Sequence, residues 1–341
     1  DFVQKKYDAV AGLSSKSKTE ALTRFLASGE EWERNTAHRL LLERKDMTAV
    51  PLLKKIAVES VYPESRARAV WLLSSMESLD LLTLKKVLAD KESGVREQAV
   101  LLAGSMFIKH PELVESVIAA SNDAAIRVRY NSSLVLGSME GSQVVQALAK
   151  SAARDGADKW FRAAVLSGIE KRMPEFLAAF REQKNAEPVA FASVMKDLGR
   201  LFGNGASAEA CRVLLKEVLV SNADPEWRIA TMLGLAEGIS GRSKEFGTSP
   251  QGLLYAILGN NASGSDITSL NNFVDKALDL AGKQTESTRL RISATALLGY
   301  TDFERSHSAL QKMMMPSAPP ELLLEAISAF TRLDDPRGAA I

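Results

Sequence analysis

The stretch from Asp90 to Met139 carries one pattern twice. The first copy reads Asp90-Lys-Glu-Ser-Gly-Val-Arg96-Glu-Gln-Ala99-Val-Leu-Leu-Ala-Gly104-Ser-Met106. The second copy reads Asp123-Ala-Ala-Ile-Arg-Val-Arg129-Tyr-Asn-Ser132-Ser-Leu-Val-Leu-Gly137-Ser-Met139. Asp, Val, Arg, Gly, Ser and Met return after 33 residues, and a fixed period of this length indicates a protein built from stacked repeats.

Each copy also carries the apolar spacing of an α-helix. Apolar or small residues recur at i, i+4, i+7, i+8 and i+11, which lie on one helix face, and they do not alternate as in a strand. These residues are Val95, Ala99, Leu102, Ala103 and Met106 in the first copy, and Val128, Ser132, Val135, Leu136 and Met139 in the second. The repeat is therefore predicted to be helical and the fold all-α.

An arginine followed three residues later by a small residue marks further copies of this helix. The pattern occurs at Arg34, Arg66, Arg96, Arg129 and Arg291, and looser versions occur at Arg162 and Arg228. From Arg34 to Arg162 the successive arginines are 32, 30, 33 and 33 residues apart. This regularity predicts an α-solenoid of about nine antiparallel helix pairs, in which each repeat buries its apolar face against its neighbours.

The repeats divide the 341 residues into four segments. Residues 1–18 are expected to be a linker, and residues 19–239 an array of helix pairs. Residues 240–265 are rich in Gly, Ser and Asn and are expected to be an insertion or a degenerate repeat, helical only near 251–258. Helix pairs resume over 266–341, where the last residues predict a turn entering another helix, so the array is expected to be truncated.

The repeat signature resembles HEAT repeats. An Asp stands in the turn, and Val-Arg, a small residue and Leu follow in the second helix. The resemblance implies a curved superhelix whose second helices line the concave side. The Asp can accept backbone N–H groups in the turn, and the Arg can bridge to the Asp of an adjacent repeat. We therefore expect Arg129 to pair with Asp90 or with Asp123.

Two longer stretches resemble one particular family. Trp32-Glu-Arg34-Asn-Thr-Ala37-His-Arg-Leu-Leu-Leu-Glu-Arg44 precedes Ala49-Val-Pro51-Leu-Leu53 and Ala69-Val-Trp71-Leu-Leu, and the end of the chain carries Arg289-Leu-Arg291-Ile-Ser-Ala294 and Pro319-Pro-Glu-Leu-Leu-Leu-Glu-Ala326. These motifs are similar to the HEAT region of the large membrane-bound-dehydrogenase-like, PVC-type haem-binding proteins of planctomycetes and verrucomicrobia. That family implies an exported or periplasmic protein with a β-propeller before this region and a c-type cytochrome after it. No Cys-x-x-Cys-His occurs here, so no haem can be attached to this chain.

Composition argues against several other functions. Lys and Arg total 43 against 42 Asp and Glu, so the net charge of +1 does not favour duplex binding. The single cysteine, Cys211, excludes an internal disulfide, and His38, His110 and His307 lack partners at metal-ligand spacing. No apolar run is long enough to span a membrane. We predict no catalytic, cofactor-binding or metal-binding residue, and no small-molecule ligand.

One enzymatic alternative stays open, a DNA-binding protein of the HEAT-like DNA glycosylase type. Trp32, Trp160 and Trp227 each stand beside a carboxylate near the start of a second helix. Their equivalent repeat positions favour a role in packing instead. The leading prediction is a non-catalytic scaffold that binds protein on its concave face, the spacer of a larger exported redox protein. Asp90, Asp123 and the seven repeat arginines are assigned as structural positions.

Overall fold

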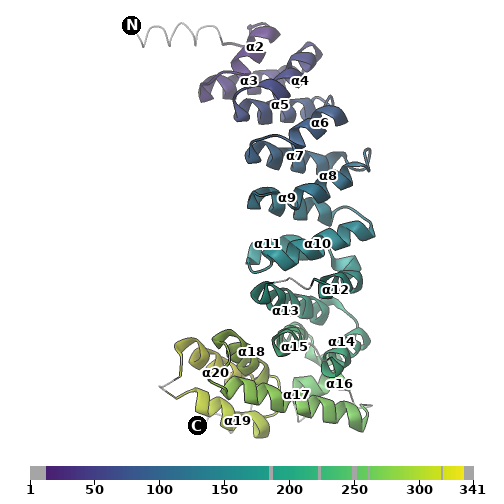
Figure 1. The fold of residues 1–341 in the computed structure, drawn as a ribbon, viewed down its shortest axis with the longest axis vertical. Coiled ribbons are helices and arrows are strands. Elements are labelled where there is room, and N and C mark those ends of the chain that lie inside the picture. The colour runs from purple at the N-terminus through teal and green to yellow at the C-terminus, as the bar shows by residue number, and fades with distance from the viewer. Residues whose placement is uncertain are drawn as a thin grey trace. The chain divides into compact units, whose positions relative to one another are not determined.

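The computed structural model describes residues 13–183, 187–221, 224–247, 252–259, 262–315 and 318–333 (Figure 1). These residues form α-helices and short 3-10 turns without any strand, so the predicted all-α class is confirmed. Residues 1–12 of the expected linker, and the expected entry into a further helix after Leu333, lie outside the described residues.

Two compact units divide the chain. Unit 1 falls within residues 1–155 and 159–184, and unit 2 within 156–158 and 185–341. No helix of the described residues is both long and apolar enough to cross a membrane.

Unit 1 consists of five helix pairs followed by one further helix. Its helices are α2 (Thr19–Leu26), α3 (Glu31–Arg44), α4 (Val50–Glu59), α5 (Pro63–Ser75), α6 (Leu81–Leu88), α7 (Ser93–Met106), α8 (Leu113–Ala120), α9 (Ile126–Gly137), α10 (Ser142–Asp155), α11 (Lys159–Ser167) and α12 (Met173–Arg181). The second helix of each pair packs against the second helix of the next, from α3 through α11, while the first helices form the opposite side (Figure 1).

The core of unit 1 lies where the apolar stripes predicted it. Val95, Ala99 and Leu102 on α7 are buried, and so are Val128 and Leu136 on α9. Where a small residue stands three positions after the arginine, it is fully buried as well, for example Ala69 on α5. A larger side chain there would force the helices apart, because interiors are packed at crystal-like density.

Unit 2 begins with α13 (Pro188–Gly205), which follows α12 in the chain. Three helix pairs and a short additional helix complete it: α14 (Ala208–Val220), α15 (Pro225–Ser240), α16 (Leu253–Leu258), α17 (Gly264–Gly282), α18 (Thr288–Leu298), α19 (Phe303–Met313) and α20 (Pro320–Arg332). The start of α15 follows from its sequence. Asp224 accepts a hydrogen bond from the Glu226 N–H, and Pro225 takes the first helical position.

The Gly-rich stretch contributes α16 to unit 2. Leu254, Tyr255 and Ile257 of this helix are buried, and it packs against α14 and α17. The second helices α15 and α18 contact each other directly. The 63 residues between Arg228 and Arg291 therefore span a single step from one second helix to the next, with α16 added on the first-helix side.

Glycines bring α13 and α15 into very close contact. A Cβ atom at Gly234 would lie 1.9 Å from the carbonyl oxygen of Lys196, and one at Gly238 would lie 2.4 Å from that of Arg200. On the other helix, Gly199 and Gly203 face the backbone of α15 at similarly short range. Only glycine fits these four positions, because any side chain would meet main-chain atoms that cannot rotate away.

Candidate functional site: an arginine–aspartate ladder and the second-helix face

The seven arginines singled out in the sequence occupy one structural position. Each is the fourth residue of a second helix, and we call this the ladder position. Its occupants are Arg34, Arg66, Arg96, Arg129, Arg162, Arg228 and Arg291. Because the arginine stands in the first turn of its helix, its guanidinium lies close to the loop that precedes this helix. It also lies close to the next repeat in the stack.

In unit 1, three of these arginines bind a carboxylate of the following repeat. Arg66 donates from Nε and Nη2 to Asp90, at 2.6 and 2.8 Å. Arg96 binds Asp123 in the same way, again at 2.6 and 2.8 Å. Parallel double hydrogen bonds of this kind are the strongest arrangement available to an arginine and a carboxylate.

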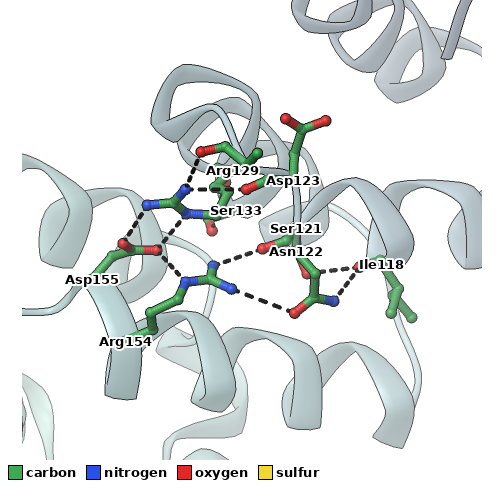
Figure 2. Close-up of polar contacts among 9 residues, drawn as sticks. Ile118, Ser121, Asn122, Asp123, Arg129, Ser133, Arg154 and Asp155 are labelled. Carbon is green, nitrogen blue, oxygen red and sulfur yellow. Dashed lines mark hydrogen bonds and ion pairs between the residues drawn. The ribbon is translucent and has the colours of Figure 1, made fainter. Parts of the chain in front are cut away.

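The third pair joins Arg129 to Asp155, the last residue of α10. The Nε and Nη2 atoms of Arg129 lie 2.9 and 2.7 Å from the two carboxylate oxygens. Figure 2 shows Arg154 on the other side of the same carboxylate, donating to Asp155 at 2.8 Å and to the carbonyl oxygen of Ser121 at 2.7 Å. Asp155 and Arg154 thus connect the pair α10/α11 to both helices of the preceding pair, α8 and α9. The three pairs, Arg66–Asp90, Arg96–Asp123 and Arg129–Asp155, constitute the arginine–aspartate ladder.

The pairs proposed from sequence were wrong in their direction. Asp90 binds Arg66 and Asp123 binds Arg96, so each aspartate faces the arginine of the preceding repeat. Arg129 does touch Asp123, but its Nη1 donates to the main-chain carbonyl at 3.0 Å (Figure 2). An arginine six residues after an aspartate lies over the backbone of that turn, and the carboxylate is already held by the other neighbour.

Asp90 and Asp123 also organise their own turns. The Oδ1 atom of Asp90 accepts the N–H of Glu92, and that of Asp123 accepts the N–H of Ala125, each at 2.8 Å. The arginine of the same repeat then donates to the aspartate's carbonyl oxygen, as Arg96 does to Asp90 at 2.8 Å. One aspartate therefore fixes its own turn and holds the preceding repeat.

The ladder keeps its carboxylates ionised. The hydrogen bond from Arg96 is the main reason that the pKa of Asp123 lies below its ordinary value. Burial is the largest single influence on the pKa of Asp90 and Asp155 and would raise it, but the arginine hydrogen bonds and the neighbouring positive charges together lower the pKa of each. These groups hold structure together and are not poised to exchange protons near neutral pH.

Arg34 occupies the ladder position without an acidic partner. Its Nη1 donates to the carbonyl oxygen of Ser28 at 2.9 Å, as the pattern requires. In the next turn, however, Ser60 stands where Asp90 and Asp123 stand in later repeats, and its hydroxyl accepts the Tyr62 N–H. The buried Nε of Arg34 has no hydrogen-bond partner among the described residues. Arg162, at the other end of unit 1, is partly buried on α11.

The arginines at the ladder position make different contacts in unit 2. Arg228 donates to the carbonyl oxygens of Val218 and Leu219 at 2.9 and 3.0 Å, and its guanidinium lies 5.2 Å from the ring centre of Phe273. Arg291 donates to the carbonyl oxygen of Ala281 at 3.2 Å. Both arginines therefore cap the C-terminal end of the first helix in their own repeat, where carbonyl groups lack helical partners.

Beyond the ladder, unit 1 exposes a row of large apolar side chains. Trp71, Leu101 and Leu134 each stand five residues after a ladder arginine, on α5, α7 and α9. Trp71 and Leu134 are 38% and 39% exposed, and Leu101 is partly exposed. We call the solvent side of these three helices the second-helix face. The sequence analysis did not predict this face. The position of these three apolar residues outside the buried stripe could have indicated it.

Hydrogen bonds between neighbouring helices hold the second-helix face in place. The Trp71 Nε1–H donates to Gln98 on α7, the second helix of the next pair, at 2.9 Å. Arg127 on α9 donates to Glu97 on α7 at 3.0 Å. The face thus combines apolar side chains with oriented polar groups.

The packing role expected for three tryptophans is correct for only one of them. Trp227 is buried at 5% exposure, whereas Trp32 is 50% exposed and Trp160 is 64% exposed. Trp32 and Trp160 each stand two residues before a ladder arginine, at the entry to the second helix. That position points toward solvent in the repeats of unit 1.

Other reactive side chains show no catalytic arrangement. Cys211 is buried and burial raises the pKa of its thiol, as expected for a structural cysteine. Burial also lowers the pKa of His38, which favours the neutral imidazole. No group of three or more His, Cys, Asp or Glu side chains suited to a metal ion occurs in the part of the chain that the structure describes.

Solved structures with similar backbones are distant. The protein YIBA_ECOLI matches over 94% of this chain and 93% of its own length, with 17% identity and a TM-score of 0.38. Kap121p bound to Nup53p matches over 97% of this chain, with 12% identity and a TM-score of 0.45, and the chain spans 43% of its length. No protein of curated function matches the sequence.

One family comparison covers the ladder itself. Residues 81–170, from α6 through α11, match the sequence model of the family described as HEAT repeats. This segment contains the Arg96–Asp123 and Arg129–Asp155 pairs and two residues of the apolar row. The regular helix pairs and the ladder agree with this match, so residues 81–170 are similar to HEAT repeats.

Proposed function

We propose that this chain is a non-catalytic scaffold that binds a protein partner on the second-helix face of unit 1. The observation that carries the proposal is the row formed by Trp71, Leu101 and Leu134. Three large apolar side chains stand at one register on the second helices of three consecutive pairs, and each is partly exposed to solvent.

Physical chemistry supports a protein as the occupant of this face. Single exposed apolar residues are common on protein surfaces, but rows of them mark contact sites. Tryptophan and arginine are enriched among the residues that dominate binding energy, and Trp71 and Arg127 both lie on this face. Because the ladder fixes the spacing of the helices, the face is organised before a partner arrives and little ordering entropy is lost on binding.

The DNA glycosylase alternative gains no support from its tryptophans. Trp227 is buried in unit 2, while Trp32 and Trp160 lie at opposite ends of the helix stack of unit 1. The near-neutral charge of the chain also gives no general attraction to phosphates.

Site-specific crosslinking tests the scaffold proposal. A photoreactive phenylalanine analogue at Leu134 is expected to crosslink a protein in extract of the source cells. The same probe at Leu82, which is 67% exposed on the first-helix side, serves as the matched control. Trp71→Ala should reduce the Leu134 crosslink at least fivefold. Equal crosslinking from both positions, or none from Leu134, would refute the proposal.

We further propose that the chain is the spacer of a larger exported redox protein. The support is the sequence resemblance around Trp32–Arg44 and Arg289–Ala294, which implies a propeller domain before this region and a cytochrome after it. The protein partner would then be a domain of the same polypeptide. Sequencing the parent reading frame tests this. An upstream signal peptide and a downstream Cys-x-x-Cys-His are expected, and the absence of both would reject the spacer role.

A further inference from the structure

Buried polar atoms without hydrogen-bond partners gather where α3 packs against α5, a contact that we call the α3–α5 seam. Among the described residues, four such atoms lie on these two helices: the Nε atoms of Arg34 and Arg68, the Nδ1 atom of His38 and the hydroxyl oxygen of Ser65. Three of the four belong to basic side chains. Because a buried donor without an acceptor costs free energy, an acceptor from outside the chain would stabilise this seam.

Arg68 carries the positive charge of the seam to the surface. Its Nη2 donates to the side-chain oxygen of Asn35 on α3, in a hydrogen bond that is exposed to solvent. Its Nη1 is neither buried nor hydrogen-bonded to a described residue, and Arg68 makes no ion pair with one. Burial and then the charge of Arg68 lower the pKa of His38, so the charge is felt within the seam. Arg68 is therefore a surface cation without a compensating anion.

The equivalent seam two repeats later, between α7 and α9, does contain a carboxylate. Glu97 follows its ladder arginine by one residue, as Asn35 does on α3. It accepts hydrogen bonds from Arg127 at 3.0 Å and from Asn131 at 3.2 Å. Asn131 in turn holds the register of Arg68, two residues after a ladder arginine. Asn35 thus offers a neutral amide where Glu97 offers a carboxylate, and the α3–α5 seam lacks one negative charge.

The uncompensated cation adjoins the apolar row of the second-helix face. Trp71 stands three residues after Arg68 on α5, and residues at this spacing are neighbours on a helix surface. Leu101 continues the row on α7. At the α9 end of the face, the charge of Arg127 is already paired with Glu97. Free positive charge is therefore found beside Trp71, and the rest of the row is apolar.

We propose that the partner of the second-helix face is a protein segment that presents an Asp or Glu carboxylate to Arg68 and large apolar side chains to Trp71 and Leu101. This inference rests on the proposed function and adds the chemistry of the partner to it. The partner carboxylate supplies the negative charge that Glu97 supplies in the equivalent seam. The apolar row favours a protein segment over a free anion, which would leave Trp71 and Leu101 in solvent.

Selection of a phage-displayed random dodecapeptide library on the full chain tests this chemistry. The selected peptides should combine Asp or Glu with Leu, Ile, Phe or Trp, and Trp71→Ala should abolish their binding. In fluorescence polarisation, changing the acidic residue of a selected peptide to its amide should weaken binding about fivefold, as expected for one partly exposed charge-assisted contact. Lys55→Gln removes an exposed cation on the first-helix side and should leave this difference unchanged.

The nearly isosteric variant Asn35→Asp tests the assignment to Arg68 without removing any basic group. It supplies a carboxylate to Arg68 from within the chain, so the acidic and amide peptides should then bind within about twofold of each other. Arg68→Gln should remove the same difference. Nuclear magnetic resonance gives a second readout, because the chain has only three histidines to assign. The pKa of His38 should be higher with the acidic peptide bound than with the amide peptide, since a carboxylate offsets the charge of Arg68.

The outcomes separate this inference from the proposed function. Apolar peptides that require Trp71 but show no acidic preference would overturn the inference and leave the proposed function standing. A preference that survives Asn35→Asp, or displacement of the acidic peptide by inorganic phosphate as effective as by unlabelled peptide, would also overturn it. The absence of any binder would overturn it as well, and crosslinking from Leu134 then decides the proposed function independently.

Discussion

Units 1 and 2 place arginine at the same point of their helix pairs and use it in opposite ways. In unit 1, Arg66, Arg96 and Arg129 reach forward to a carboxylate of the next repeat. In unit 2, Arg228 and Arg291 reach back to main-chain carbonyls of their own repeat. The position is therefore constant, and the local availability of a carboxylate decides whether it links repeats or caps a helix.

The two units also bring their second helices together by different means. Unit 1 alternates small buried residues with the charged ladder, so neighbouring helices are held by polar bonds at one end and by apolar packing along their length. Unit 2 replaces the ladder between α13 and α15 with backbone contacts across Gly199, Gly203, Gly234 and Gly238. Paired charges therefore contribute to specificity in unit 1, where Gly137 and Gly168 also meet closely, whereas α13 and α15 fit together by shape.

Both units share the requirement for a small residue after the ladder arginine, and breaking it should have the largest effect. Ala99→Asp in unit 1 and Ala294→Asp in unit 2 place a charge in a fully buried contact. Each should lower the free energy of unfolding by about 4 kcal/mol or more. Urea titration followed by circular dichroism measures this. If one variant unfolds like the unmodified protein, that unit does not use the assigned register.

Removing the ladder arginine should destabilise the two units to different extents. Arg66→Met leaves the nearly buried carboxylate of Asp90 uncompensated and should cost about 3 kcal/mol. Arg228→Met leaves only two carbonyl groups without their donor and should cost about 1–2 kcal/mol. Hydrogen exchange read by mass spectrometry assigns each loss to its unit. A larger cost for Arg228→Met would contradict the distinction between pairing and capping.

Lowering the pH should destabilise unit 1 more than unit 2. The pKa values of Asp46, Asp80, Asp90, Asp123 and Asp155 are lowered in unit 1, against Asp266 alone in unit 2 among the described residues. A carboxyl whose pKa is lowered by folding stabilises the protein above its unfolded pKa of about 3.9, and this stabilisation is lost as the pH falls through the folded value. Hydrogen exchange at pH 5 and pH 3 should therefore show earlier opening of unit 1.

The acid prediction has an internal control. Arg66→Met removes the main cause of the lowered pKa of Asp90, so this variant should lose less stability between pH 5 and pH 3 than the unmodified protein. Equal acid sensitivity of the two units, or of the variant and its parent, would show that the ladder aspartates do not govern the response.

The smallest expected effect is a gain in the stability of unit 1. Ser60→Asp supplies Arg34 with the carboxylate that Asp90 gives to Arg66, and it should stabilise unit 1 by about 1 kcal/mol. Ser60→Asn keeps the turn but adds no charge, and it should be neutral. Thermal melting of both variants measures the difference. A loss of stability with Ser60→Asp would show that Arg34 is not positioned to receive a carboxylate.

Much of the fold could be predicted from the local sequence, because each repeat is formed by residues that lie close together in the chain. Helical spacing placed the buried stripes, and the Asp224–Pro225 pair marked the start of α15. The arginine's use of a neighbouring repeat was anticipated, but its partner was not. Pairing direction depends on how successive turns are offset in space, and Asp155 went unnoticed because it ends a helix instead of opening a turn.

The surface was harder to predict than the core. Trp32 and Trp160 share a repeat register, and a shared register identifies an equivalent position without saying whether it faces inward. The close contact of α13 and α15 was equally hidden, because glycines in a helix carry no sign of what approaches them. Both questions depend on contacts between residues far apart in the sequence, which a single sequence does not supply.

The forward direction of the ladder makes the number of repeats in unit 1 adjustable. Residues 90–122 contain one aspartate that receives from the previous repeat and one arginine that gives to the next. A tandem copy of this segment would leave every ladder charge paired, because Arg96 of the first copy would meet Asp90 of the second. Duplication or deletion of this segment would therefore leave no ladder charge of unit 1 without its partner. The interlocked glycines of α13 and α15 allow no such copying.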